Sequence, residues 1–363
     1  MASANEVVFA SAGSGKTSYL LEHALSDPNK RVLLVTYTNE NLREINSRLW
    51  ESHKGQPTNV ETMTLFEFLL RECVKPYQTL KAEIAQIRSV NFVTDNPPFS
   101  ARSDFVRYYL DSANNIYSDA VSDLACVLNA ESGGKVIKRL EAIYDKLLID
   151  ELQDLAGWDL EFLLLLLQSS IQVVMVGDLR QAVYSTNRSN KNSQFRGAKL
   201  QNWIDSRVTA GECAKIEHTH SYRCIQSICD FADSVYPKFP STTSKNTQST
   251  DHDGVFLVYE SDVDAYRESL MPQELRWDRR NKKAGLSAKN FGEVKGLAFP
   301  RVLIFPTAPI LRFVEDGTTL QEVSAAKFYV AVTRARQSVG IVTNKKVTKS
   351  SLTYWTPTAT TDA

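Results

Sequence analysis

An eight-residue segment near the start of the chain constrains the fold more than any other feature. Residues Ala10 to Thr17 read A-S-A-G-S-G-K-T and lie between an apolar run, Glu6 to Ala10, and a helix-forming stretch from Lys16 to about Leu25. This is the G-x-x-x-x-G-K-[ST] pattern with Ala in its first position. The order predicts a strand, a glycine-rich turn and a helix, which together begin an α/β domain with a parallel sheet.

The same turn predicts a site for the phosphates of ATP. Glycines allow backbone N–H groups to turn inward around a phosphate, and the positive end of the helix dipole adds to the attraction. In this pattern Lys16 reaches the β- and γ-phosphates, and the hydroxyl of Thr17 binds Mg²⁺. A tight turn without a ligand is the alternative interpretation. The predicted nucleotide-binding residues of the turn are Ala12, Gly13, Ser14, Gly15, Lys16 and Thr17.

Later apolar runs extend the α/β pattern. Arg31–Thr36, Lys146–Asp150 and Gln172–Val176 are nearly continuous in apolar residues, as expected of strands buried on both faces of a parallel sheet. A predicted helix, Leu160–Gln168, separates the last two. Residues 68–144 have apolar residues at three- and four-residue spacing and few strand-like runs. They therefore predict a helical insertion in the first domain.

The second half of the chain repeats this style. Helices are predicted from Ser221 to Val235 and near Ala325 to Thr333, and strands at Val255–Tyr259, Arg301–Phe305 and Gly340–Val342. The tail, residues 348–363, is rich in Thr and Ser and is expected to be disordered. The fold class is thus α/β, with two parallel sheets flanked by helices and a small helical insertion in the first domain.

Composition and charge indicate a globular protein of two or three domains. The 363 residues are 43% hydrophobic and 23% charged, and 42 Lys and Arg balance 42 Asp and Glu. A net charge of zero does not favour a nucleic-acid binder that works through bulk charge, although a local groove is compatible with it. Five scattered cysteines, no apolar leader and no membrane-spanning run predict a cytoplasmic or nucleoid-associated protein that is not secreted and binds no membrane.

Two adjacent carboxylates follow one of the predicted strands. Residues 147–154 read L-L-I-D-E-L-Q-D, so Asp150 and Glu151 end an apolar run. In a nucleotide hydrolase the first carboxylate holds Mg²⁺ and the second orients and deprotonates the attacking water. A charged loop after a core strand is the alternative. Together with the phosphate turn, the pair predicts ATP hydrolysis, with Thr17 and Asp150 as metal ligands and Lys16 and Glu151 as catalytic residues.

These and later motifs resemble, in order along the chain, those of the UvrD/Rep-type superfamily 1 DNA helicases. Each motif is modest alone, but the ordered set is highly specific and spans nearly the whole sequence. The matching segments are GSGKT (13–17), VTYTNENLREI (35–45), TMTLF (62–66), DELQD (150–154), VGDLRQAVY (176–184), SYR (221–223), GEVKGLAFPRVLI (292–304) and YVAVTRA (329–335).

The resemblance implies a role for each matched residue of the ATP site. Gln181 senses the γ-phosphate and the attacking water, Arg223 and Arg334 act as arginine fingers, and Tyr222 stacks on the adenine. It also implies two RecA-like P-loop NTPase domains. Domain 1A comprises residues 1–67 and 145–215, a 1B-like insertion 68–144, and domain 2A residues 216–347, with domain 2B absent or vestigial at 240–289.

The resemblance further implies a helicase or translocase that moves 3′ to 5′ on single-stranded or tailed DNA, with RNA as an alternative. Its single-strand contacts are Tyr37, Asn39, Thr62, Phe195 and Arg196, and core packing is the alternative for Tyr37 and Phe195. Base stacking on aromatic rings tolerates any sequence, as a motor requires. A rival interpretation is an ATPase switch, triggered by nucleic acid, that regulates a partner such as a nuclease without unwinding.

The sequence departs from the family pattern at three places that bear on the site. Ser18, predicted to contact the nucleotide, stands where many relatives have an Arg against the adenine, and Ala298 stands where they have a Glu for the ribose. Nine polar residues, TNRSNKNSQ (186–194), separate Ser185 from Phe195, which relatives run together. We expect this insert to project toward solvent or nucleic acid, where Arg188 and Lys191 would meet phosphates.

Overall fold

The computed structural model describes residues 5–55, 57–81, 83, 86–92, 101–183, 186–346 and 350–357. The chain divides into two compact units. The first comprises residues 1–9, 16–179 and 184–217, and the second comprises residues 10–15, 180–183 and 218–363. Two short segments that the sequence assigns to domain 1A, residues 10–15 and 180–183, therefore group with the second unit. The predicted insertion at 68–144 lies within the first unit.

A six-stranded sheet in the order β3-β2-β6-β7-β1-β8 forms the centre of the first unit. Its strands are β1 (Glu6–Ala10), β2 (Val32–Thr36), β3 (Val60–Thr64), β6 (Lys146–Ile149), β7 (Gln172–Gly177) and β8 (Ala214–His218). Strands β3, β2, β6, β7 and β1 run parallel to one another. Their carboxyl ends therefore share one edge of the sheet, where only β7 separates the strand that leads into the glycine-rich turn from the strand that ends in the acidic pair.

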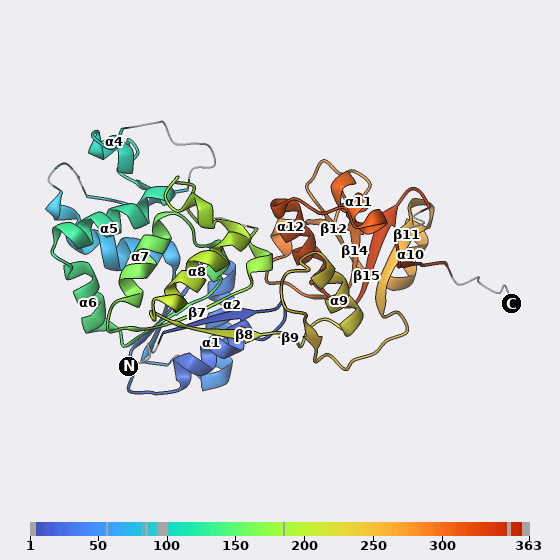
Figure 1. The fold of residues 1–363 in the computed structure, drawn as a ribbon, viewed down its shortest axis with the longest axis horizontal. Coiled ribbons are helices and arrows are strands. Elements are labelled where there is room, and N and C mark those ends of the chain that lie inside the picture. Colours follow the sequence, from blue (N-terminus) through green and yellow to red (C-terminus); the bar gives the residue numbers. More distant parts are fainter. Residues whose placement is uncertain are drawn as a thin grey trace. The chain divides into compact units, whose positions relative to one another are not determined.

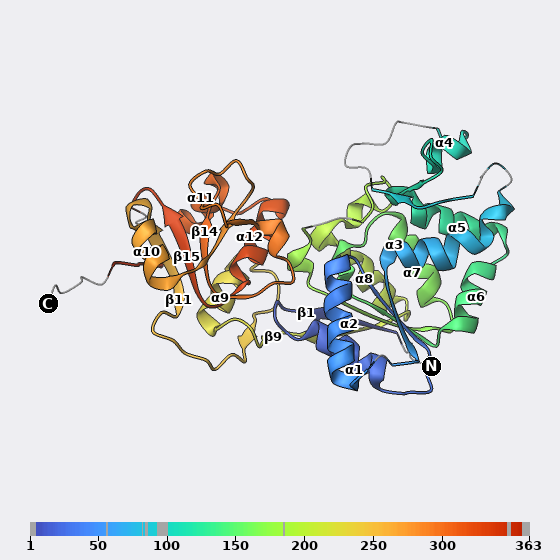
Figure 2. The same cartoon turned by 180° about the vertical axis from the view of Figure 1, so that it is seen from behind.

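Helices surround this sheet, and Figure 2 shows α1 and α2 side by side over it. The helices of the first unit are α1 (Lys16–Leu25), α2 (Asn39–His53), α3 (Leu65–Phe68), α4 (Phe105–Tyr109), α5 (Val121–Glu131), α6 (Lys135–Ile143), α7 (Trp158–Leu167) and α8 (Leu200–Thr209). The insertion is mainly helical, as predicted, and it contains a π-helical turn, Leu69–Val74, after α3. It also contains two short paired strands, β4 (Val90–Asn91) and β5 (Ile116–Tyr117).

The second unit has its own six-stranded parallel sheet, in the order β13-β12-β14-β15-β11-β16. The strands are β11 (Gly254–Tyr259), β12 (Gln273–Arg276), β13 (Lys289–Asn290), β14 (Phe299–Phe305), β15 (Ala335–Thr343) and β16 (Thr353–Tyr354), and a separate pair is formed by β9 (His220–Ser221) and β10 (Thr243–Ser244). The helices are α9 (Gln226–Ser234), α10 (Val263–Leu270), α11 (Ala308–Asp316) and α12 (Glu322–Val332).

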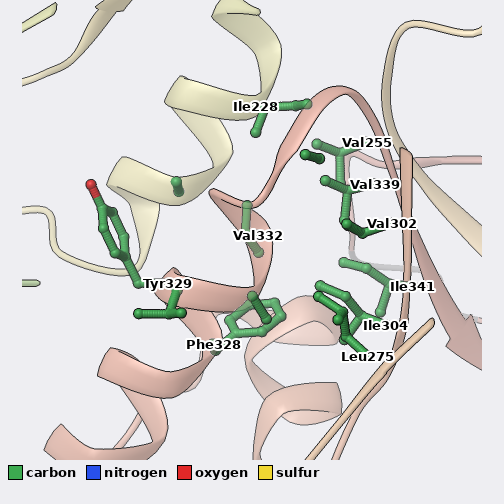
Figure 3. Close-up of a cluster of buried hydrophobic side chains, with 14 of the residues drawn as sticks. Ile228, Val255, Leu275, Val302, Ile304, Phe328, Tyr329, Val332, Val339 and Ile341 are labelled. Carbon is green, nitrogen blue, oxygen red and sulfur yellow. The ribbon is translucent and has the colours of Figure 1, made fainter. Parts of the chain in front are cut away.

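Apolar side chains cover both faces of this second sheet. On one face, residues of α9, α11 and α12 pack against the strands, and Figure 3 shows part of this cluster, including Phe328, Val302 and Ile341. On the other face, Val263 and Tyr266 of α10 pack on Leu303 and neighbouring side chains. Figure 1 shows α9 and α12 on the opposite side of the sheet from α10. The predicted α/β class with two parallel sheets flanked by helices is confirmed.

Two expectations for the second half need correction. The helix predicted from Ser221 begins at Gln226. Residues 222–224 form bends, and Ser221 and Tyr222 hydrogen-bond to the glycine-rich turn instead. The tail is not entirely disordered, since β16 pairs with β11 and the Trp355 N–H donates to the Leu257 carbonyl at 2.9 Å. Residues 240–289 supply β10, β11, α10 and β12, so most of this segment builds the second unit itself. None of the helices in the described ranges is long and apolar enough to cross a lipid bilayer.

Candidate functional site

The glycine-rich turn lies between β1 and α1, as the sequence predicts. Gly13 (φ 76°) and Gly15 (φ 87°) adopt left-handed backbone conformations that strain other residues. A Cβ on Gly13 would lie 2.5 Å from the Arg223 Cβ, so only glycine fits there. The Ser14 hydroxyl is buried and has no hydrogen-bond partner within the described part of the chain. Because an unpaired buried hydroxyl is costly, an oxygen-rich ligand such as a phosphate fits this turn.

The S-Y-R segment, residues 221–223, hydrogen-bonds to the glycine-rich turn, and both belong to the second unit. The Ser221 hydroxyl donates to the Ala12 carbonyl at 2.7 Å, and the Tyr222 N–H donates to the Gly13 carbonyl at 2.9 Å. Tyr222 is 60% exposed, and its ring lies edge to face with the His220 ring, with 5.1 Å between the ring centres. Exposure of this ring is compatible with the predicted stacking on adenine, which stays a prediction.

The acidic pair follows β6 in a strained turn. Glu151 has φ 57° and ψ 42°, a left-handed conformation that is uncommon for a residue with a side chain. Its N–H donates to Asp150 Oδ1 at 2.9 Å, and its carbonyl accepts the Asp154 N–H at 2.9 Å. Strain of this kind is often stored at functional sites. The turn therefore fixes the backbone of the predicted catalytic base.

The oxygen donors predicted for a metal suit Mg²⁺. A hydroxyl from Thr17 and a carboxylate from Asp150 are hard oxygen ligands, and Mg²⁺ is usually held by one or two carboxylates together with water and substrate phosphates. No group of three or more His, Cys, Asp or Glu side chains able to hold a metal occurs among the described residues. The residues present thus fit a nucleotide-bound Mg²⁺ rather than an all-protein metal cage.

Two of the predicted catalytic residues meet in the second unit. Arg334 is only 1% exposed, and its Nη2 donates to Gln181 Oε1 at 3.3 Å. The rest of its guanidinium donates to the carbonyls of Val330 (3.0 Å) and Leu297 (3.2 Å). Arg223 lies on the same unit, where its Nη1 donates to the Thr333 carbonyl at 3.2 Å. The geometry therefore joins the predicted sensor Gln181 to the predicted finger Arg334.

Arg180 is a residue of this region that the sequence did not single out. It is buried, and its guanidinium donates to Ser11 Oγ at 2.8 Å and to Asp233 Oδ1 at 3.0 Å. The guanidinium also lies 4.9 Å from the centre of the Tyr329 ring. It thus ties the segments that contain Ser11 and Gln181 to helices α9 and α12. Only its place beside Gln181 could have signalled this role, since an isolated Arg usually lies at the surface.

The predicted nucleic-acid contacts all lie on the first unit. Asn39 is exposed at the start of α2, whereas the Thr62 hydroxyl donates to Asn46 Oδ1 at 2.7 Å. The Tyr37 ring packs 5.9 Å from Phe66, whose ring contacts Phe92 at 5.0 Å. Phe92 is 62% exposed and was not predicted, because nothing in its surroundings in the sequence marks it. Tyr37 is thus the first of a row of three aromatic rings, and base stacking by Tyr37 stays a prediction.

Phe195 and Arg196 follow the insert. Phe195 ends a short 3₁₀ turn, Ser193–Phe195, and is half-buried. The Arg196 guanidinium donates to the Ser189 carbonyl. The Arg196 guanidinium, predicted to contact single-stranded nucleic acid, thus already binds the insert. Nucleic-acid binding by Phe195 and Arg196 stays a prediction.

The expectation that the insert projects to solvent or nucleic acid is met only in part, since Arg188, Asn190, Lys191, Ser193 and Gln194 are exposed but the first two residues are not. Thr186 and Asn187 are buried, and the Asn187 amide donates to the Asp119 carbonyl at 2.9 Å. Arg188 binds Asp119 (2.8 Å) and Lys191 binds Glu161 (3.3 Å), so both cations pair with carboxylates of the first unit. The burial of Thr186 and Asn187 was not predicted, because polar side chains can be buried when their hydrogen bonds are satisfied.

The start of helix α7 packs closely against the first residues of this insert. A Cβ on Gly157 would lie 2.4 Å from Asn187 Oδ1, so glycine permits the close approach. The Thr186 and Ser122 hydroxyls donate to the Asp159 carboxylate. Burial raises the pKa of Asp159 to about 6, and these two hydrogen bonds oppose that shift. The insert is therefore part of the packed structure of the first unit.

We expect Asn187→Ala to destabilise the protein. The substitution leaves the Asp119 carbonyl without this donor and opens a small cavity, which should lower the free energy of unfolding by about 1–3 kcal/mol. Urea denaturation measures this change. Asn190→Ala, at an exposed position of the same insert, is the matched control and should change stability by less than about 0.5 kcal/mol. Equal effects of the two substitutions would contradict the structural role.

Comparisons with known families agree with these motifs. Residues 1–187 match the family model of an AAA domain. Residues 129–343 match the family model of the viral superfamily 1 RNA helicase core domain. Each match covers more than half of the 363 residues, and together they run from residue 1 to residue 343.

A curated relative and several solved structures are also similar. The ATP-dependent DNA helicase PcrA of Leuconostoc citreum is 22% identical over 284 residues, which is 63% of this chain and 36% of PcrA. The chain thus spans about a third of the length of that relative. Arterivirus nonstructural protein 10 (helicase) is 14% identical with a TM-score of 0.49, over 94% of this chain and 60% of that one. The PRRSV helicase is 14% identical with a TM-score of 0.46, over 94% and 52%.

Proposed function

This chain belongs to the superfamily 1 helicases, and we propose on that basis that it hydrolyses ATP to move along single-stranded nucleic acid. The observation that supports this most is the hydrogen bond between Arg334 and Gln181, because the two predicted catalytic residues are 153 positions apart in sequence. An arginine beside a residue that senses the γ-phosphate suits the stabilisation of a phosphoryl-transfer transition state.

The proposed chemistry assigns one task to each residue. The backbone N–H groups of the glycine-rich turn and the Lys16 ammonium bind the phosphates, and the Glu151 carboxylate accepts a proton from the attacking water. Gln181 orients that water, and Arg223 and Arg334 offset the negative charge that spreads over the phosphoryl oxygens. Thr17 and Asp150 would hold Mg²⁺, which when bound neutralises charge on the β- and γ-phosphates.

For the substrate, we propose single-stranded or tailed DNA and movement 3′ to 5′, as in a UvrD/Rep-type enzyme. The order of motifs and the printed name of the PcrA relative, a DNA helicase, support DNA. The match to an RNA helicase core domain makes RNA the alternative. A cytoplasmic or nucleoid-associated location would follow from this function.

A second candidate function is an ATPase switch that regulates a partner such as a nuclease. The size of the second unit favours it, because residues 240–289 mainly build that unit's own sheet and leave little chain for an added domain 2B. Such a switch would hydrolyse ATP in the presence of nucleic acid and leave duplexes intact.

A strand-displacement assay separates these functions. The full chain, with ATP and Mg²⁺, is given duplexes with a 3′ tail or a 5′ tail, made of DNA or RNA. Displacement of 3′-tailed DNA alone supports the main proposal. ATP hydrolysis without displacement of any duplex would support the switch instead, and preference for a 5′ tail or for RNA would overturn the proposed polarity or substrate.

A further inference from the structure

We propose that Gln153 is a positioning residue that orients Glu151 for the attack of water, an inference that rests on the proposed function. Gln153 lies in the 3₁₀ turn Leu152–Asp154 that follows the acidic pair, and it is 2% exposed. Its amide Nε2 donates a hydrogen bond to Glu151 Oε2. The sequence places Gln153 in the DELQD segment but does not predict a role for its side chain.

The orientation of the Gln153 amide is fixed by the neighbouring strand. The N–H of Asp178, which follows β7, donates to Gln153 Oε1 at 3.0 Å. Because a backbone N–H requires an acceptor, the oxygen of the amide must face Asp178, and the NH₂ group must therefore face Glu151. Both ends of this buried amide are used, so it cannot turn over without losing two hydrogen bonds.

Gly177 makes this arrangement possible. A Cβ at Gly177 would lie 2.6 Å from Gln153 Oε1 and 3.1 Å from the Leu152 Cβ, so a larger residue would displace the amide. The close approach links the end of β7 to the turn after β6. The Glu151 carboxylate is reached from this turn by the hydrogen bond of the Gln153 amide. A catalytic base must be held in its productive geometry by surrounding hydrogen bonds.

Gln153→Glu tests the amide. The substitution keeps the size of the side chain and an oxygen for the Asp178 N–H, but it replaces the donor beside Glu151 with a second carboxylate. A displaced base commonly costs on the order of 10–100-fold in rate, so we expect kcat for ATP hydrolysis to fall by that factor while KM changes little. A fall in kcat at nearly constant KM marks a change in the chemical step rather than in nucleotide binding.

Two further variants keep the test decisive. Gln153→Met removes both hydrogen bonds without adding charge, and it should lower kcat in the same way. It replaces Gln153→Glu as the test if that variant does not fold. Gln168→Glu is the matched control, because the exposed Gln168 lies at the C-terminal end of α7 and donates to Glu212 Oε1 at 2.8 Å. It should leave kcat unchanged. Binding of a fluorescent ATP analogue checks that each variant is folded.

The double variant Glu151→Gln, Gln153→Glu distinguishes positioning from a general structural effect. If Gln153 acts through Glu151, the double variant should be no slower than Glu151→Gln alone. Losses that multiply would overturn the inference, as would wild-type kcat in both Gln153 variants when Glu151→Gln is slow. If the wild-type protein hydrolyses no ATP, or if Glu151→Gln keeps full activity, the proposed function fails instead.

Discussion

Glu151→Gln should abolish most ATP turnover and leave ATP binding nearly intact. The amide keeps the shape of the side chain but cannot accept the proton of the attacking water. General-base catalysis typically contributes 10²- to 10⁴-fold, so kcat should fall on the order of 10²–10⁴-fold. Steady-state hydrolysis and binding of a fluorescent ATP analogue measure the two quantities separately.

Glu67→Gln provides the matched control for this variant. Glu67 is an exposed residue of α3, and its carboxylate lies 3.5 Å from the Arg71 guanidinium. The same substitution there should not change turnover. If Glu151→Gln weakened ATP binding as much as turnover, Glu151 would be a structural residue of the turn and not the proposed base.

Arg334→Lys should have the second large effect. A lysine keeps the positive charge but loses the planar fork that now reaches Gln181, Val330 and Leu297 at once. Arginine fingers are worth about 10³–10⁵-fold in turnover, and we expect a loss on the order of 10³-fold or more with ATP still bound. Single-turnover hydrolysis measures the chemical step directly.

Arg267→Lys controls for the loss of an arginine from the second unit. Arg267 binds Glu274 through two hydrogen bonds, of 2.7 and 3.1 Å, and has no place in the proposed chemistry. Its replacement should lower thermal stability without slowing hydrolysis. A variant Arg334→Lys with normal turnover would rule out Arg334 as a finger.

Strands with continuous apolar sequences were predictable, and mixed or polar ones were not. The runs at β1, β2 and β7 gave strands within one residue of their observed ends, because burial on both faces leaves little room for polar residues. Strand β12 reads Q-E-L-R and escaped prediction. For β15 the sequence predicted a strand only at Gly340–Val342. The strand begins at Ala335, but the polar residues Arg336, Gln337 and Ser338 interrupt the apolar pattern.

The candidate site divides in a similar way. Residues that a motif specifies, such as Lys16 and Glu151, could be found from spacing alone. Gln153 and Arg180 could not be assigned tasks, because these depend on contacts with Asp178, Ser11 and Asp233 that only the fold creates. The burial of Thr186 and Asn187 could not be predicted either, since the polarity of the insert at 186–194 gives no sign of the hydrogen bond that Asn187 makes to Asp119.

The proposed motor function is tested by ATP hydrolysis by the full chain, measured with Mg²⁺ in the absence and presence of single-stranded oligonucleotides. We expect a basal rate that rises when single-stranded DNA is added, and a loss of both rates in Glu151→Gln. No hydrolysis with any oligonucleotide, or hydrolysis that persists in Glu151→Gln, would contradict it.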